Sequence, residues 1–197
     1  MGKGRLEAFS DGVMAVIITI MVLELHAPHE PSLAALAEAA PAFLAYVLSF
    51  IFIGIYWNNH HHMFQATDHV NGAILWANNF LLFWLSLVPF ATDWMGENHF
   101  ATVPVAIYGE VLLMCGIAYY IVQTLIIRLQ GPDSKLQRLV GGDWKGKLSP
   151  ILYLAAIGLA FITPVLAELI YAAVALIWLI PDRRIERQLA QEGSEAE

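Results

Sequence analysis

The sequence predicts an all-α integral membrane protein with six transmembrane helices per chain. Two features of its composition lead to this prediction. Hydrophobic residues make up 58% of the chain and charged residues only 14%, whereas a soluble domain carries roughly a quarter charged residues. The apolar residues also fall into runs that approach the ~20 residues a helix needs to cross a bilayer. A third feature, the placement of lysine and arginine, orients the helices.

Six apolar runs are separated by short polar segments, apart from one longer hydrophilic connector before the fifth run. Because no run of soluble character is long enough to form its own core, we expect the whole chain, residues 1–197, to form a single six-helix transmembrane domain. The predicted spans are about 6–26, 38–65, 70–95, 102–130, 148–163 and 164–181, followed by a tail at 183–197.

The fifth and sixth runs are short and meet at Thr163 and Pro164. Threonine can cap a helix and proline favours its first position, so this junction predicts a tight turn between two spans. The alternative is one long helix kinked at Pro164, which gives five spans.

The basic residues favour six spans over five. With six, all ten lysines and arginines fall on one side of the membrane. With five, Arg183, Arg184 and Arg187 would lie on the opposite side. Because basic loops stay in the cytoplasm, we expect a multi-pass protein of the cell inner (plasma) membrane with both termini and the tail cytoplasmic.

The first run carries a stripe of residues on one helical face. At about 100° per residue, the stripe is about 100° wide and contains Phe9, Gly12, Val16, Thr19, Ile20 and Leu23. Spacing alone favours ordinary helix packing, with the threonine hydroxyl bonded to its own backbone. The functional alternative is a pore wall, in which apolar rings at Val16, Ile20 and Leu23 gate the pore and Thr19 supplies a ring of hydroxyls.

Polar residues of three runs should lie at one depth. Asp11 in or near lipid costs roughly 2.5–3.5 kcal/mol and needs a partner. Three consecutive histidines end the second run, and Trp76 and Asn78 begin the third. We therefore expect a buried polar cluster of Asp11, Ser10, Asn78 and one histidine. The polar residues expected at this depth are Ser10, Asp11, His60, His61, His62, Trp76 and Asn78.

The histidines suggest a pH response more than a metal site. Consecutive histidines on a helix fan over about 200°, so they cannot all bind one ion, and we expect no native metal site. If His61 pairs with Asp11, acidification should alter gating, because histidine titrates near neutral pH.

Three ordered motifs resemble the lysosomal potassium channel family, also called the transmembrane protein 175 family. They are "RLEAFSDG" in the first run, "YWNNHHHMF" in the second and "LWANNFLLFWLSLVPF" in the third. This resemblance implies a homotetramer in the lipid bilayer, with the first helix lining a central pore for monovalent cations. It implies constrictions at Val16, Ile20 and Leu23, and a selectivity role for Thr19. Val16 is smaller than the family's usual residue, which leaves a wider inner constriction or Leu23 as the effective gate.

The resemblance also implies that Arg5, Ser10 and Asp11 are structural or gating residues. K⁺ would be the permeant ion, with no cofactor. We expect modest K⁺ over Na⁺ selectivity, because one hydroxyl ring offers few ion ligands.

Rival functions have weaker support in the sequence. A proton-conducting channel or proton-coupled secondary transporter would use intramembrane acids such as Glu110 and Glu168, and a broken helix such as one at Pro89. A scaffold protein without transport activity is a further alternative. An enzyme lacks any convincing nucleophile–base pair or metal triad. A nucleic-acid partner lacks a basic face to bind.

Overall fold

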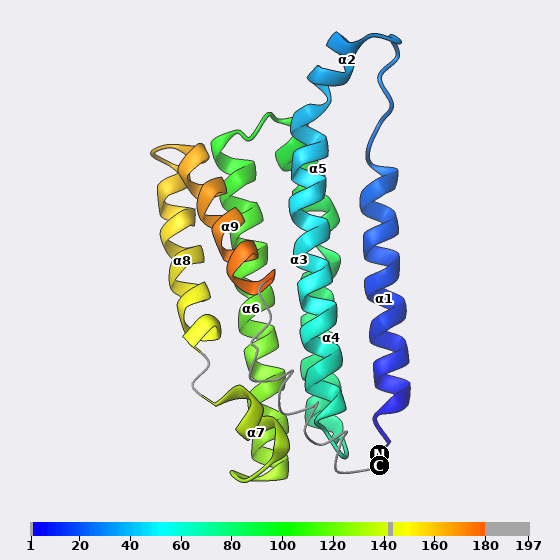
Figure 1. Cartoon of the computed structure of the whole chain (residues 1–197), viewed down its shortest axis with the longest axis vertical. Coiled ribbons are helices and arrows are strands. Elements are labelled where there is room, and N and C mark those ends of the chain that lie inside the picture. Colours follow the sequence, from blue (N-terminus) through cyan, green and yellow to red (C-terminus); the bar gives the residue numbers. More distant parts are fainter. Residues whose placement is uncertain (1, 142–143, 180–197) are drawn as a thin grey trace.

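A computed structural model describes residues 2–141 and 144–179. In this part of the chain, all regular structure is helical, and the long helices run side by side along one axis (Figure 1). The long helices are α1 (Gly4–Leu23), α3 (Ala40–Gln65), α4 (Gly72–Ser86) with α5 (Val88–Glu97), α6 (Thr102–Gln130), α8 (Trp144–Ala160) and α9 (Pro164–Leu179); the short ones are α2 (Leu33–Glu38) and α7 (Lys135–Val140).

Four segments are long and apolar enough to cross a membrane: Gly4–Leu23, Ala40–Gln65, Gly72–Glu97 and Thr102–Gln130. They coincide with the first four predicted spans, and they confirm a multi-pass membrane protein. The helices α8 and α9 have 17 and 16 residues in the described chain, fewer than the ~20 of a full span. The count of six spans therefore stays a prediction.

The junction before Pro164 is a turn between two helices. The helix α8 ends at Ala160, and α9 begins at Pro164, whose missing N–H costs nothing at a helix start. The two helices then pack against each other (Figure 1). The alternative of one long kinked helix is therefore wrong. The end of the last predicted span and the tail at 183–197 lie outside the described residues.

The third span is interrupted where α4 meets α5. Pro89 lies in the first turn of α5, where its missing N–H breaks the continuous hydrogen-bond ladder. Just beyond it, Thr92 donates to the carbonyl of Val88 at 2.7 Å and lies 2.6 Å from the Ser49 hydroxyl. Ser49 lies 2.9 Å from the Tyr108 hydroxyl. This buried hydroxyl chain ties α3, α5 and α6 together at the interruption.

The helices α6 and α9 approach closely at Gly109. A Cβ atom at this position would lie 1.9 Å from the hydroxyl oxygen of Tyr171 and 2.9 Å from Ile157. Tyr171 is fully buried and donates a hydrogen bond to the carbonyl of Val105 at 3.2 Å. Only glycine leaves room for this tyrosine against the backbone of α6.

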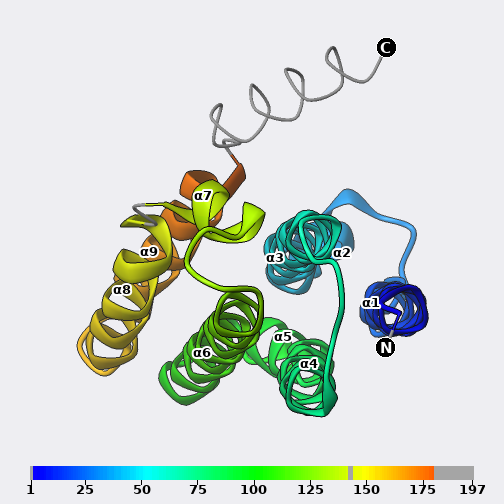
Figure 2. The same ribbon diagram turned by 90° about the horizontal axis from the view of Figure 1, so that it is seen from below.

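Helix α1 stands at one edge of the bundle, beside α3 and α4 (Figure 2). One stripe of α1 is buried against them, and Lys3 donates to the terminal carbonyls of Phe64 and Gln65 on α3. A lysine is favourable there because it satisfies carbonyl groups at the negative end of a helix dipole. The buried stripe consists of Leu6, Ser10, Met14, Ile17 and Met21. Val13 and Ile18 beside this stripe are partly buried, and most other residues of α1 are exposed in the described chain.

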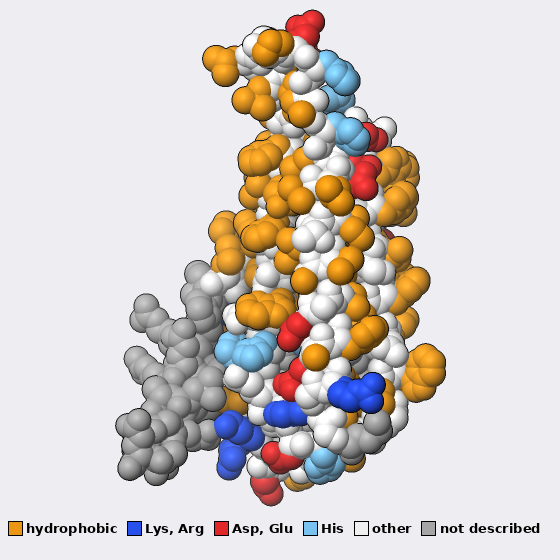
Figure 3. All heavy atoms as spheres, turned by 90° about the vertical axis from the view of Figure 1, so that its right-hand side faces the viewer, with side chains coloured by type: hydrophobic (Ala, Val, Ile, Leu, Met, Phe, Trp, Pro, Cys, Tyr) orange, Lys and Arg blue, Asp and Glu red, His pale blue; other side chains and the backbone are white. Residues whose placement is uncertain are grey.

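The two ends of the bundle differ in charge. Seen from the α1 side, hydrophobic side chains cover the middle of the molecule (Figure 3). On this face lysine and arginine appear only toward the lower end, where α1 begins, together with acidic and histidine side chains, whereas the upper end shows acidic and histidine side chains alone. This sidedness is the one expected from a membrane protein whose basic loops share one side.

Candidate functional site

The predicted stripe of α1 is largely exposed. Val16 is 55% exposed, Ile20 41% and Leu23 76%. Thr19 and Gly12 are exposed on the same face. Within the described residues the stripe is therefore only partly covered by its own chain, and its exposed part is available to lipid or to other copies of the chain.

Thr19 makes the local hydrogen bond that its position in a helix offers. Its hydroxyl donates to the carbonyl of Val16 at 2.9 Å. This bond uses the only proton of the hydroxyl and leaves the lone pairs of its oxygen free to accept. A threonine held in this way presents an oxygen, and not a donor, to whatever lies beside α1.

A groove runs along α1 where it meets α4 and α5. Its walls include Val16 and Ile20 from the predicted stripe, together with Phe90 and Asp93 from α5. Glu24, at the end of α1, lines the same groove. The sequence reasoning named neither Phe90 nor Asp93 as a site residue. Asp93 could have been recognised from the sequence, because, like Asp11, it is an acidic residue inside an apolar run.

A directed chain of hydrogen bonds joins α1, α3 and α4. The Ser10 hydroxyl donates to the carbonyl of Leu6 at 2.8 Å, so its oxygen accepts from the amide nitrogen of Asn78 at 2.9 Å. The amide oxygen of Asn78 then faces His60 and lies 2.8 Å from its Nε2. This arrangement requires a proton on Nε2. All three side chains are at most 2% exposed.

Ser10, Asn78 and one histidine therefore meet as expected, but Asp11 does not join them. Its carboxylate accepts a hydrogen bond from Nε1 of Trp57 at 3.0 Å, on the outside of the bundle. The expected pairing of Asp11 with His61 is absent. His61 stacks on Trp57, with ring centroids 6.0 Å apart, and its Nε2 lies 2.8 Å from the amide nitrogen of Gln65. The cause is geometric, because Asp11 follows Ser10 by one residue and so points about 100° away from the buried face.

Two further residues of the expected network lie outside it. Trp76 is 77% exposed, and Arg5 is exposed at the start of α1. The sequence did not predict Trp57 as a partner of Asp11, although the ring N–H of a tryptophan is a hydrogen-bond donor that needs an acceptor in a membrane. Among residues 2–141 and 144–179, no group of three or more histidine, cysteine or acidic side chains is placed to hold a metal ion.

Comparison with known proteins links this geometry to a family. The family described as "Endosomal/lysosomal potassium channel TMEM175" matches residues 5–89, which hold α1, α3, α4 and the start of α5. A potassium channel of Chryseobacterium sp. strain P1-3 is 56% identical over 191 residues, which is 97% of this chain and 100% of that protein. The chain belongs to the TMEM175 family.

The structural comparison agrees with this assignment. The crystal structure of a lysosomal potassium-selective channel TMEM175 homolog from Chamaesiphon minutus superposes with a TM-score of 0.79 at 27% sequence identity. The match covers 90% of this chain and 96% of that one. The relatives that match this chain are ion channels and not enzymes, and the matched fold is that of an ion channel.

An animal member of the TMEM175 family carries a different functional name. The human endosomal/lysosomal proton channel TMEM175 is 30% identical over 131 residues, which is 60% of this chain and 26% of that protein. The names within the family therefore include both potassium and proton channels.

Proposed function

We propose that this chain forms a potassium-permeable cation channel, in which α1 from each of four copies lines a central pore. The observation that carries the proposal is the exposed stripe of α1 at Val16, Thr19, Ile20 and Leu23. This stripe lies in the segment that matches a family of potassium channels. A transmembrane helix at the edge of its own bundle, with one face unpaired, suits a position around a shared axis.

Three apolar side chains of α1 form the gate in this proposal. Val16, Ile20 and Leu23 are spaced by three and four residues, so each projects toward the axis from the same side of the helix. Rings of such side chains close a pore to ions by expelling water. Leu23 is the most exposed of the three. It is also larger than Val16 and so forms the tighter ring.

Thr19 provides selectivity between these apolar rings. Its hydroxyl is committed to the Val16 carbonyl as a donor, so four such oxygens would face a passing cation as acceptors. A single ring of hydroxyls replaces only part of an ion's water shell, and the preference for K⁺ over Na⁺ is accordingly modest. Glu24 and Asp93 lie beyond it along the α1 groove, where negative charge raises the local concentration of cations.

The polar residues beside α1 hold it in place. Ser10, Asn78 and His60 connect it to α3 and α4 through buried bonds. Asp11 makes a second connection outside, through Trp57. His61 supports the Trp57 ring by stacking. Arg5 and Trp76 are exposed, and their roles in the proposal are contacts with lipid or with a neighbouring copy.

The proposed orientation places both termini in the cytoplasm, in the inner (plasma) membrane of the cell. It is supported by the lysines and arginines near the start of α1 and around α7. Six spans bring the tail back to the same side.

Proton conduction is the second candidate function. The observation that favours it is the family relationship to animal channels named for protons. A proton crosses along chains of water and hydroxyls, so it can pass a narrower constriction than a hydrated K⁺ ion.

The test uses purified protein in liposomes loaded with potassium. Flux is followed with a potassium-sensitive dye, and proton movement with a pH-sensitive dye in parallel. We expect Leu23→Ala and Val16→Asn to raise potassium flux several-fold, because each opens or wets a ring. Val22→Ala is the matched control, since Val22 is 46% exposed but lies off the stripe.

Three results separate the candidates. Unchanged potassium flux in both stripe variants would rule out this face as the pore. A pH signal without any potassium signal would favour the proton channel. Projection images of the protein in detergent must show four-fold symmetry with α1 nearest to the axis, and any other helix in that place would contradict the proposal.

A further inference from the structure

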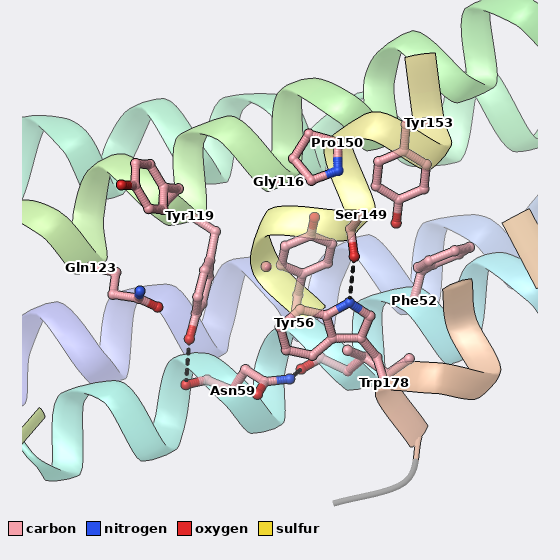
Figure 4. A pocket seen from close by; sticks show the side chains of 13 residues that line it. Phe52, Tyr56, Asn59, Gly116, Tyr119, Gln123, Ser149, Pro150, Tyr153 and Trp178 are labelled. Atoms are coloured by element: carbon pink, nitrogen blue, oxygen red, sulfur yellow. Dashed lines mark hydrogen bonds between the residues drawn. The ribbon is translucent and has the colours of Figure 1, made fainter. Parts of the chain in front are cut away.

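A pocket lies on the opposite side of the bundle from the α1 stripe. It is formed by α3, α6, α8 and α9, and it runs from Phe52 and Tyr153 to Asn59 and Gln123 (Figure 4). The described part of α9 ends at Leu179. The pocket lies beside that end, where Trp178 forms part of its wall.

Aromatic rings and uncharged polar groups make up most of the pocket wall. Its aromatic residues are Phe52, Tyr56, Tyr119, Tyr120, Tyr153 and Trp178. Gly116 leaves one side open, since a Cβ atom there would have only the Tyr56 hydroxyl near it, at 3.8 Å. None of the thirteen lining side chains belongs to an acidic residue, an arginine, a lysine or a histidine.

Two hydrogen bonds already join the helices around the pocket. The Tyr119 hydroxyl donates to the carbonyl of Asn59 at 3.1 Å, and Nε1 of Trp178 donates to the Ser149 hydroxyl at 2.9 Å (Figure 4). These bonds link α6 to α3 and α9 to α8. They tie the helices that form the pocket wall to one another.

Three further polar side chains line the pocket. Gln123 is 6% exposed and Tyr153 is 3% exposed, and both line the pocket. Within residues 2–141 and 144–179, neither the Gln123 amide nor the hydroxyls of Tyr153 and Tyr56 make a hydrogen bond to the protein. A ligand in the pocket can offer hydrogen bonds to these groups, which line its wall.

We propose that this pocket binds an uncharged, lipid-soluble ring compound that carries a hydroxyl or carbonyl group. Flat rings pack well against aromatic walls, edge to face or offset. The hydroxyl or carbonyl pairs with the amide of Gln123. A lipid acyl chain would fill the same space but offers no hydrogen bond, and a charged headgroup would meet no opposite charge among the thirteen lining residues of the described chain.

The test measures the binding of 2-naphthol to the full chain in nanodiscs by titration calorimetry, with empty nanodiscs subtracted. Naphthalene serves as the matched ligand without the hydroxyl. We expect saturable 2-naphthol binding and about tenfold weaker naphthalene binding, which corresponds to about 1.4 kcal/mol. Gln123→Leu should reduce 2-naphthol binding toward the naphthalene level and leave naphthalene binding unchanged.

Gly116→Leu fills the pocket and should abolish binding of both compounds. Gly158→Leu on α8 is the control, because Gly158 is exposed and has no atom close to its Cβ position. Equal affinities for the two compounds, undiminished binding to Gly116→Leu, or only the uptake seen in empty nanodiscs would each overturn the proposal.

A structure of the unmodified protein with 2-naphthol provides a test that does not depend on the variants folding. Density for a flat ring between Tyr153 and Gln123 supports the proposal. Density for a lipid acyl chain in the pocket, or a ring bound only elsewhere, overturns it.

Discussion

The amide nitrogen of Asn78 lies 2.9 Å from the hydroxyl oxygen of Ser10, and this buried contact joins α4 to α1. Helix α1 has few other polar ties to the bundle, because its remaining buried residues are Leu6, Met14, Ile17 and Met21. Apolar contacts give little specificity of position in a membrane, where lipid tails are as apolar as the side chains. The Asn78 amide is therefore the buried polar contact that orients α1 and its exposed stripe, beside the bonds that Lys3 and Asp11 make at the exposed edge of α3.

Replacement of Asn78 by leucine should destabilise the protein by about 1–3 kcal/mol, because Ser10 and His60 lose their shared partner inside the bundle. The free energy of unfolding is measured in mixed micelles with an increasing concentration of a denaturing detergent. Asn79→Leu is the control, since Asn79 is exposed at the neighbouring position. Equal stability of the two variants would show that the chain from Ser10 to His60 contributes nothing.

The contact between Asp11 and Trp57 should contribute much less to stability. Both side chains are exposed, and Asp11 accepts a single hydrogen bond at 3.0 Å. We expect Trp57→Phe and Asp11→Ala each to lower the free energy of unfolding by about 1 kcal/mol or less, since solvent or lipid headgroups can replace the bond. A double-mutant cycle measures the coupling between the two. A coupling above that of Asn78 with Ser10 would mean that the exposed contact, and not the buried one, is the stronger tie between α1 and the bundle.

The sequence predicted which helices meet but not which histidine they use. Ser10 and Asn78 could be placed at one depth from the order of the spans alone. His60, His61 and His62 share that depth, and only the packing of α3 shows that His60 is the one turned inward. Asp11 was assigned to the interior because a carboxylate in lipid needs a partner. Trp57 meets this need from outside, and periodicity cannot rank the two solutions.

The start of a helix inside an apolar run was also only partly predictable from the sequence. Pro164 marks the start of α9 as expected, because proline at a first helical position is compatible with the fold. Pro89 occupies the same kind of position in α5, but no polar segment precedes it, so the sequence predicted a single span over 70–95 and offered a break at Pro89 only under the transporter alternative. The pocket beside Trp178 collects residues from four helices and has no signature in the linear chain.

Substitution of Gly109 by alanine should be among the most damaging changes of a single methyl group. The new Cβ would overlap the Tyr171 hydroxyl and crowd Ile157, and overpacking of this kind costs about 1–3 kcal/mol or more. Gly12→Ala is the control, as nothing lies within 4 Å of its Cβ position. Unfolding of both proteins in mixed micelles gives the comparison. The double variant Gly109→Ala with Tyr171→Phe should recover part of the loss; a variant as stable as the parent would show that α6 and α9 are not in contact at this position.

Replacement of Thr19 tests the proposed role of its hydroxyl in ion selectivity. Valine has nearly the same shape but no oxygen, whereas serine keeps the oxygen and its bond to the Val16 carbonyl. We expect Thr19→Val to reduce the K⁺ over Na⁺ permeability ratio toward one and Thr19→Ser to retain most of it, because only the oxygen can replace water around the ion. Reversal potentials under biionic conditions provide the ratio. An unchanged ratio in Thr19→Val, in a protein that still conducts, would mean that selectivity arises elsewhere along the pore, and the apolar rings at Ile20 and Leu23 would then be the nearest elements to test by changes of side-chain size.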